Sequence, residues 1–100
     1  MQISEVQISI VKPNNGLVAF ASLVIDGSIY LSSIAIHQKL NGSGYRLTYP
    51  TKKIGNQNIG LFYPINKNST KLIEEAIFEK LKDVMKGNDN ARYNSFNSKF

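Results

Sequence analysis

The stretch LVAFASLVIDGSIYLSSIAI, residues 17–36, decides the fold. Its two apolar runs are rich in β-branched and aromatic residues, which favour strands. Asp26 and Gly27 stand between the runs, and both residue types accept the positive φ that a tight hairpin turn requires. The sequence therefore predicts an antiparallel hairpin with a two-residue turn, in which Ile25 lies opposite Ser28.

In that register, the strands at residues 17–25 and 28–36 would have apolar side chains on both faces. One face would comprise Val18, Phe20, Val24, Ile29, Leu31 and Ala35. The other would comprise Leu17, Ala19, Ala21, Leu23, Ile25, Tyr30, Ile34 and Ile36. A sheet with one solvated face alternates apolar and polar residues instead. Both faces are therefore expected to be covered, and a second subunit is the simplest cover for the face that one helix cannot reach.

Weaker strand patterns flank this hairpin. Residues 3–11 nearly alternate between apolar and polar and predict a first strand, and residues 45–49 predict a fourth strand with a basic polar face. Residues 52–60 have the composition of a polar loop. Residues 59–63 predict a short fifth strand that ends at Pro64.

One amphipathic helix is predicted after these strands. Apolar residues recur at three- and four-residue intervals from residue 72 to residue 84. Asn68, Ser69 and Thr70 are N-cap candidates, and the pair at 87–88, Gly-Asn, is the predicted C-cap. The helix would have about five turns and could cover one face of a small sheet.

Together these elements predict an α+β fold, with an antiparallel sheet of four to five strands followed by one C-terminal helix in a homodimer. Residues 1–87 would form the single domain, and residues 88–100 a polar tail that is more typical of a frayed end than of a docked segment. The chain has no cysteine, no segment resembling a signal peptide and no apolar run of membrane-spanning length. These features favour a cytoplasmic protein that does not enter a membrane.

Catalytic patterns are not found in the sequence. His37 is the only histidine, no cysteine can pair with it, and the glycines fit neither a phosphate loop nor a dinucleotide fingerprint. We therefore predict a protein that is not an enzyme and that uses no cofactor, metal or small-molecule substrate.

The charge distribution points to an anionic partner. The chain has a formal net charge of +5 and a pI of about 9.6, and no acidic residue lies between Gly27 and Ile73. The cations of this acid-free segment are Lys39, Arg46, Lys52, Lys53, Lys67 and Lys71. They are candidate contacts to the phosphate backbone of DNA or RNA, although a solvated basic surface would have the same composition. No base-reading motif is present, so no sequence preference is predicted.

The order of these motifs resembles the SpoVG (stage V sporulation protein G) family. The resemblance rests on EVQISIV at residues 5–11, the hairpin at 19–36, YPTKK at 49–53, and YPIN at 63–66 followed by NST and the helix. It implies an antiparallel sheet with a C-terminal helix, a homodimer and a nucleic-acid-binding regulator of septation or sporulation in bacteria.

The resemblance also extends to individual positions. Lys52 and Lys53 match the basic pair of the family's Pro-Ser-Lys-Arg-like turn, although Lys53 stands where the family has an arginine with bidentate phosphate geometry. Tyr63 replaces the histidine of the family's His-Pro-Ile element. The alternative hypothesis is a dimeric protein-interaction module. Clustering of the six cations on one surface across the dimer would favour nucleic-acid binding, and scatter would favour the alternative.

Overall fold

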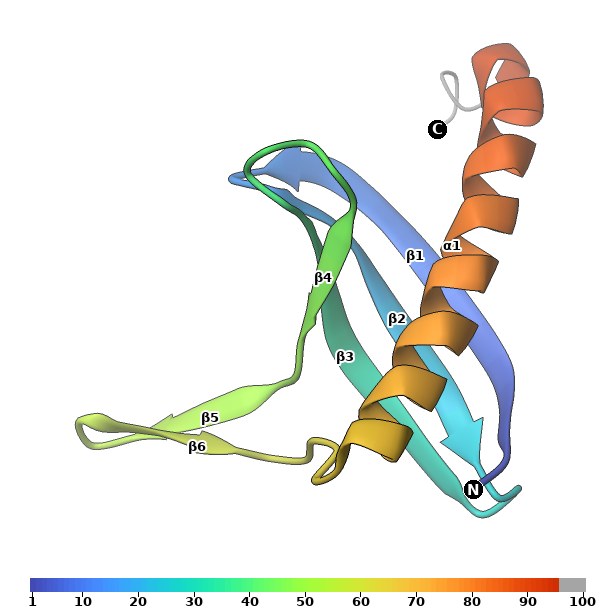
Figure 1. The fold of residues 1–100 in the computed structure, drawn as a ribbon. Helices are drawn as coiled ribbons and strands as arrows, with labels where there is room; N and C mark the ends of the chain where they lie inside the picture. The colour runs from blue at the N-terminus through green and yellow to red at the C-terminus, as the bar shows by residue number, and fades with distance from the viewer. Residues whose placement is uncertain (96–100) are drawn as a thin grey trace.

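A four-stranded antiparallel sheet, a separate two-stranded hairpin and one long helix make up the structure (Figure 1). The computed structural model describes the backbone of residues 1–95 and the side chains of residues 1–86. The elements are β1 (Ile3–Asn14), β2 (Leu17–Ile25), β3 (Ile29–Gln38), β4 (Tyr45–Thr48), β5 (Thr51–Ile54), β6 (Gln57–Gly60) and α1 (Lys67–Ser95). The larger sheet has the order β1-β2-β3-β4, so each strand pairs with its neighbour in sequence. The α+β prediction is confirmed.

The β2–β3 turn has the expected type I′ backbone. Asp26 and Gly27 both have positive φ, +52° and +64°, and Ser28 N donates to Ile25 O at 2.9 Å. The predicted register is wrong, however, because Ile25 pairs with Ile29 and not with Ser28. Ser28 Oγ donates to Asp26 O at 3.1 Å, which holds Ser28 in the loop as an additional residue.

A β-bulge in β3 shifts the register a second time. Ala21 pairs with Ile34 and Leu23 pairs with Leu31, so two residues of β3 lie opposite one of β2, and Ser33 within the bulge has a φ of +63°. The bulge places Leu31 and Ile34 on the same face although they are three residues apart.

These two shifts, with a third between Leu17 and Ala19, overturn part of the predicted face assignment. Val18, expected on the face of Phe20, is buried in the core. Leu31, expected beside Phe20, instead packs against the core with Leu23. Tyr30, expected beside Leu23, pairs with Val24 and lies on the opposite face.

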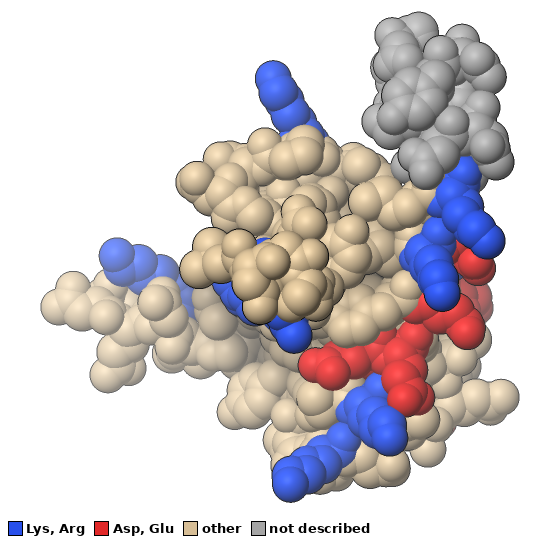
Figure 2. Space-filling view, turned by 45° about the horizontal axis from the view of Figure 1, so that its top comes forward, with Lys and Arg blue, Asp and Glu red and all other residues tan. Residues whose placement is uncertain are grey.

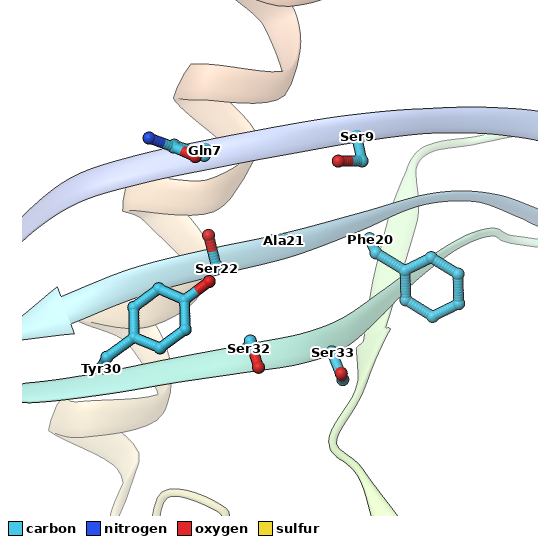
Figure 3. Close-up of a pocket in the computed structure, with 8 residues that line it drawn as sticks. All are labelled: Gln7, Ser9, Phe20, Ala21, Ser22, Tyr30, Ser32 and Ser33. Carbon is cyan, nitrogen blue, oxygen red and sulfur yellow. The ribbon is translucent and has the colours of Figure 1, made fainter.

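The hydrophobic core lies between the larger sheet and α1, which crosses one face of it (Figure 1). The buried residues of the core are Val18, Ala19, Ala21, Leu23, Ile34 and Ile36 from the sheet and Ile73, Ile77 and Leu81 from α1. The apolar stripe predicted for the helix therefore faces the sheet as expected. No element of the described chain covers the other face of the sheet (Figures 1 and 3).

Helix α1 is longer at both ends than predicted. Asn66 is the N-cap, because its Oδ1 accepts a hydrogen bond from Ser69 N at 2.8 Å, so the cap predicted within residues 68–70 is wrong. The predicted C-cap is also wrong, since the helix continues through Gly87 to Ser95. One interior glycine costs a helix only about 1 kcal/mol relative to alanine, and favourable neighbours can offset this. Phe96 and Phe100, which the tail prediction included, lie outside the described residues.

The segment predicted as a polar loop is a β-hairpin. Strands β5 and β6 pair across a turn at Gly55, whose φ is +63°, and β6 ends at Gly60, so the predicted strand at residues 59–63 is wrong. Every residue of both strands is exposed, and the hairpin extends away from the body of the molecule (Figure 1). We call residues 51–60 the arm.

Tyr49 lies at the base of the arm. Its ring meets Phe62 edge-on, with a centroid distance of 6.2 Å, and both rings pack against the core. Its hydroxyl is buried without a hydrogen-bond partner among the described residues. Burial, reinforced by the charge of Glu74, raises the pKa of Tyr49 to about 12, so this hydroxyl keeps its proton at neutral pH.

Candidate nucleic-acid interface

The structure places the six candidate cations in three separate regions of the chain. Lys39 and Arg46 lie around the β3–β4 turn, Lys52 and Lys53 on the arm, and Lys67 and Lys71 in the first turns of α1. All six are exposed to solvent. Figure 2 shows basic side chains at several separated positions, while acidic side chains gather on one side of the molecule. Within one chain the cations therefore do not form a single patch in this view, which favours the protein-interaction module, and one surface formed across a dimer stays a prediction.

Lys52 and Lys53 point to opposite faces of the arm, because successive residues of a strand alternate. Lys52 pairs with Ile59 and shares its face with Ile54, whereas Lys53 pairs with Asn58 on the polar face. Ile54 and Ile59 are 55% and 42% exposed. The arm is therefore amphipathic, with one lysine on each side. The loop prediction could not show this, since a loop has no alternation.

The start of α1 combines two cations with a helix terminus. Lys67 and Lys71 are exposed, and the first turn contains no acidic residue. The positive end of the helix dipole lies at the same place and adds to their attraction for anions. Its role as a contact to anions stays a prediction.

Arg46 lies on the sheet face opposite α1, because its neighbours Tyr45 and Leu47 pack against the core. Its Nη1 donates to Thr48 Oγ1 at 3.2 Å, and its cross-strand partner is His37. Arg46 is the candidate cation that belongs to the uncovered face of the sheet.

That uncovered face holds an open concavity of about 310 Å³ across β1, β2 and β3 (Figure 3). We call this surface the outer face. It is lined by Gln7, Ser9, Phe20, Ala21, Ser22, Tyr30, Ser32 and Ser33, none of which is acidic. The face is more polar than the predicted register implied, because the additional loop residue Ser28 moved Leu31 to the core side and Tyr30 away from it.

Two exposed aromatic side chains stand on the outer face. Phe20 is 37% exposed and Tyr30 is 67% exposed. Figure 3 shows the Tyr30 ring reaching toward Ser22, with Phe20 farther along the same side of the sheet. Sequence reasoning considered Tyr45, Tyr49 and Tyr63 as stacking residues and missed these two. A register with Ser28 as a third loop residue would have placed Tyr30 on this face.

Comparison with known proteins identifies the family of this chain. Residues 1–83 match the family model described as SpoVG. The chain belongs to the SpoVG family. A relative from Finegoldia magna, named "Putative septation protein SpoVG", is 31% identical over 81 residues, which cover 80% of this chain and 73% of the relative. The family assignment made from the motif order is thereby confirmed.

The residues that the structure describes contain no group of three or more His, Cys, Asp or Glu side chains arranged to hold a metal ion. Within the same part of the chain, no helix has the length and apolar character needed to cross a membrane.

Proposed function

We propose that this SpoVG-family protein is a regulator of the septation or sporulation type that binds the phosphate backbone of DNA or RNA in the bacterial cytoplasm. The observation that supports the proposal best is the segment from Gly27 to Ile73, which contains six cations and no acid, and in which all six cations are exposed. Uncompensated exposed charge of this kind attracts polyanions without regard to sequence.

The arm and the helix start supply the proposed contacts. Lys52 and Lys53 would make the first contacts to phosphate, with Lys67, Lys71 and the positive end of α1 as support. Lys39 and Arg46 would extend the contact surface at the β3–β4 end of the sheet. The opposite orientation of the two arm lysines means that one phosphate strand reaches both only by passing around the arm.

The test is a double substitution, Lys52→Gln with Lys53→Gln, which removes two charges per chain and leaves the strand pairing in place. Each lost phosphate contact flattens the slope of log affinity against log salt by about 0.9 for duplex DNA or 0.7 for a single strand. A dimer that makes all four contacts would lose roughly 3 to 4 from its slope. Affinity should fall similarly for all sequences, because phosphate contacts contain no base information.

A matched control variant separates the effect of lost phosphate contacts from the effect of a lower net charge. Lys80→Gln with Lys82→Gln removes the same charge from exposed positions on α1 that lie outside the acid-free segment. We expect this control to keep a slope close to the wild type. An arm variant that stays folded and binds with wild-type affinity and slope would refute the proposed contacts.

A second candidate function is a dimeric protein-interaction module, and the apolar surface of the arm region favours it. Ile54, Ile59, Leu61, Tyr63 and Ile65 are all large apolar or aromatic side chains that are more than 40% exposed within 12 residues of sequence. Lone two-stranded hairpins are marginally stable in water, so this arm is expected to pack against something. We propose a second copy of the chain as its partner. In this view the homodimer forms through the arm, and not through the outer face of the sheet.

A further inference from the structure

We propose that the outer face of the sheet binds the unpaired bases of a single-stranded nucleic acid, with Phe20 and Tyr30 as stacking platforms. This inference rests on the proposed nucleic-acid-binding function and adds the class of ligand and the surface that receives its bases. The acid-free segment explains attraction to phosphate, but it does not explain two exposed rings on a polar sheet.

The exposure of the two rings is the first argument. Aromatic side chains in strands normally pack into a core or against cross-strand partners, as Tyr45 does with Phe78 at a centroid distance of 6.5 Å. Phe20 and Tyr30 instead project from the face that α1 does not cover, among serines. Exposed aromatic residues on an antiparallel sheet are a common platform for unstacked bases, because every base has a π-face.

The spacing of the rings suits a polynucleotide better than a small ligand. Tyr30 pairs with Val24, which is four residues from Phe20 along β2. At about 3.3 Å per residue, the backbones of the two positions are roughly 13 Å apart along the sheet, and the Tyr30 ring, which reaches toward Ser22, lies closer to Phe20 than its backbone does (Figure 3). The rings therefore lie within about four steps of a stacked strand at 3.4 Å per step, and within fewer steps of an extended one.

The surroundings of the rings complete the argument. Ser9, Ser22, Ser32, Ser33 and Gln7 offer donors and acceptors to base edges and sugars, and no carboxylate lines the concavity. At the Phe20 end, Phe20 pairs with Ala35, and Ala35 with Thr48, the residue to which Arg46 donates its hydrogen bond. Arg46 therefore lies at the Phe20 end of the outer face, where its charge can contact the phosphate backbone of the bound strand.

The composition of the outer face argues against a second copy of the chain as its binding partner. The core of a protein–protein interface is depleted in serine and is more apolar than the rest of the surface, whereas four of the eight residues lining this concavity are serines. The apolar surface that suits a protein partner is on the arm. A duplex is also a poor fit, since its bases are stacked within the helix and cannot lie on a ring.

The experiment measures binding of a 20-nucleotide oligothymidylate and of a 20-base-pair duplex by Phe20→Ala, Tyr30→Ala and the double variant. Each alanine should weaken binding of the single strand about 5- to 140-fold, from the usual range for the loss of one base–aromatic stack. The slope of affinity against salt should not change, because no charge is removed. Wild-type protein should prefer the single strand, and the variants should lose that preference.

Control variants make the result specific to stacking on this face. Tyr30→Phe keeps the ring and should bind within about twofold of the wild type, because stacking does not need the hydroxyl. Phe20→Trp introduces the only tryptophan of the chain, whose fluorescence should change when oligothymidylate binds.

The outcomes separate this inference from the proposed function. If the alanine variants fold and bind oligothymidylate like the wild type while the lysine variant loses affinity, the outer face is not the base platform, and phosphate binding stands. If the wild type binds neither nucleic acid, the proposed function is wrong and this inference with it. If Phe20→Ala converts a dimer into a monomer, the face is a protein interface, and the inference is overturned.

Discussion

Replacement of Gly27 by valine tests the turn on which the whole sheet depends. Asp26 and Gly27 occupy the two central positions of a type I′ turn, with φ values of +52° and +64°. A Cβ built at Gly27 meets no atom within 4 Å, so valine would cause no collision with the rest of the protein. The expected loss comes from the backbone alone. A non-glycine residue held at positive φ costs about 1–3 kcal/mol, and a β-branched residue belongs at the upper end of that range.

The matched control is Gly27→Asn, because asparagine tolerates the left-handed region through its short polar side chain. We expect the valine variant to lose about 2 kcal/mol, which lowers the Tm of a domain of this size by about 8–16 °C. Changes at exposed lysines usually stay within about 0.5 kcal/mol, so Lys80→Gln provides the baseline. Thermal unfolding followed by circular dichroism at one fixed protein concentration measures all three. Equal Tm values for the valine and asparagine variants would refute a turn with two positive φ angles.

Two further predictions concern the helix start and the arm. Asn66→Ala should destabilise the protein by about 1 kcal/mol, because the N–H of Ser69 loses its acceptor. The control Asn68→Ala removes no cap and should cost less than half of that. Equal losses of the two variants in urea unfolding would show that Asn66 is not the cap. Ile54→Ser with Ile59→Ser should turn a dimer into a monomer in sedimentation experiments at micromolar concentration. The control Asn58→Ser, on the polar face of the arm, should leave the dimer intact. A compact monomer for the wild type would contradict the proposed dimer.

Local turn chemistry made the central hairpin predictable. Asp-Gly between two apolar runs specifies the turn type without help from distant residues, and the structure has positive φ at both positions. The helix stripe was also predictable, since Ile73, Ile77 and Leu81 recur at the helical period and are buried. Both features depend on patterns that lie within about a dozen residues of sequence.

The register was not predictable from the turn, because three departures follow it. Ser28 adds a residue to the loop through its bond to Asp26 O, the Ser32–Ser33 bulge adds another in β3, and a third shift lies in β2 between Leu17 and Ala19. A slip of one residue exchanges the two faces of a strand, so each departure reverses the assignment of every residue beyond it until the next. Tyr30 lies between the first two departures and was therefore assigned to the wrong face. Sequence reasoning found the phosphate-binding candidates, which need only charge, and missed the aromatic candidates, which need register.

The arm shows a different kind of failure, and its cause bears on function. Residues 52–60 contain only two strongly apolar side chains, Ile54 and Ile59, and neither is buried within the chain. A strand is normally recognised by the face that it buries, so a hairpin that buries nothing in its own chain has the composition of a loop. Its two isoleucines nevertheless share one face with Lys52, while Lys53 and Asn58 occupy the other. An exposed hairpin with apolar side chains on one face and polar side chains on the other is typical of a surface that packs against another molecule. If the apolar side packs on a second copy, Lys53 is left facing solvent, and the outer face of the sheet stays free for a nucleic acid. The single substitution Lys53→Gln should then flatten the salt slope more than Lys52→Gln, which removes a charge from the covered side.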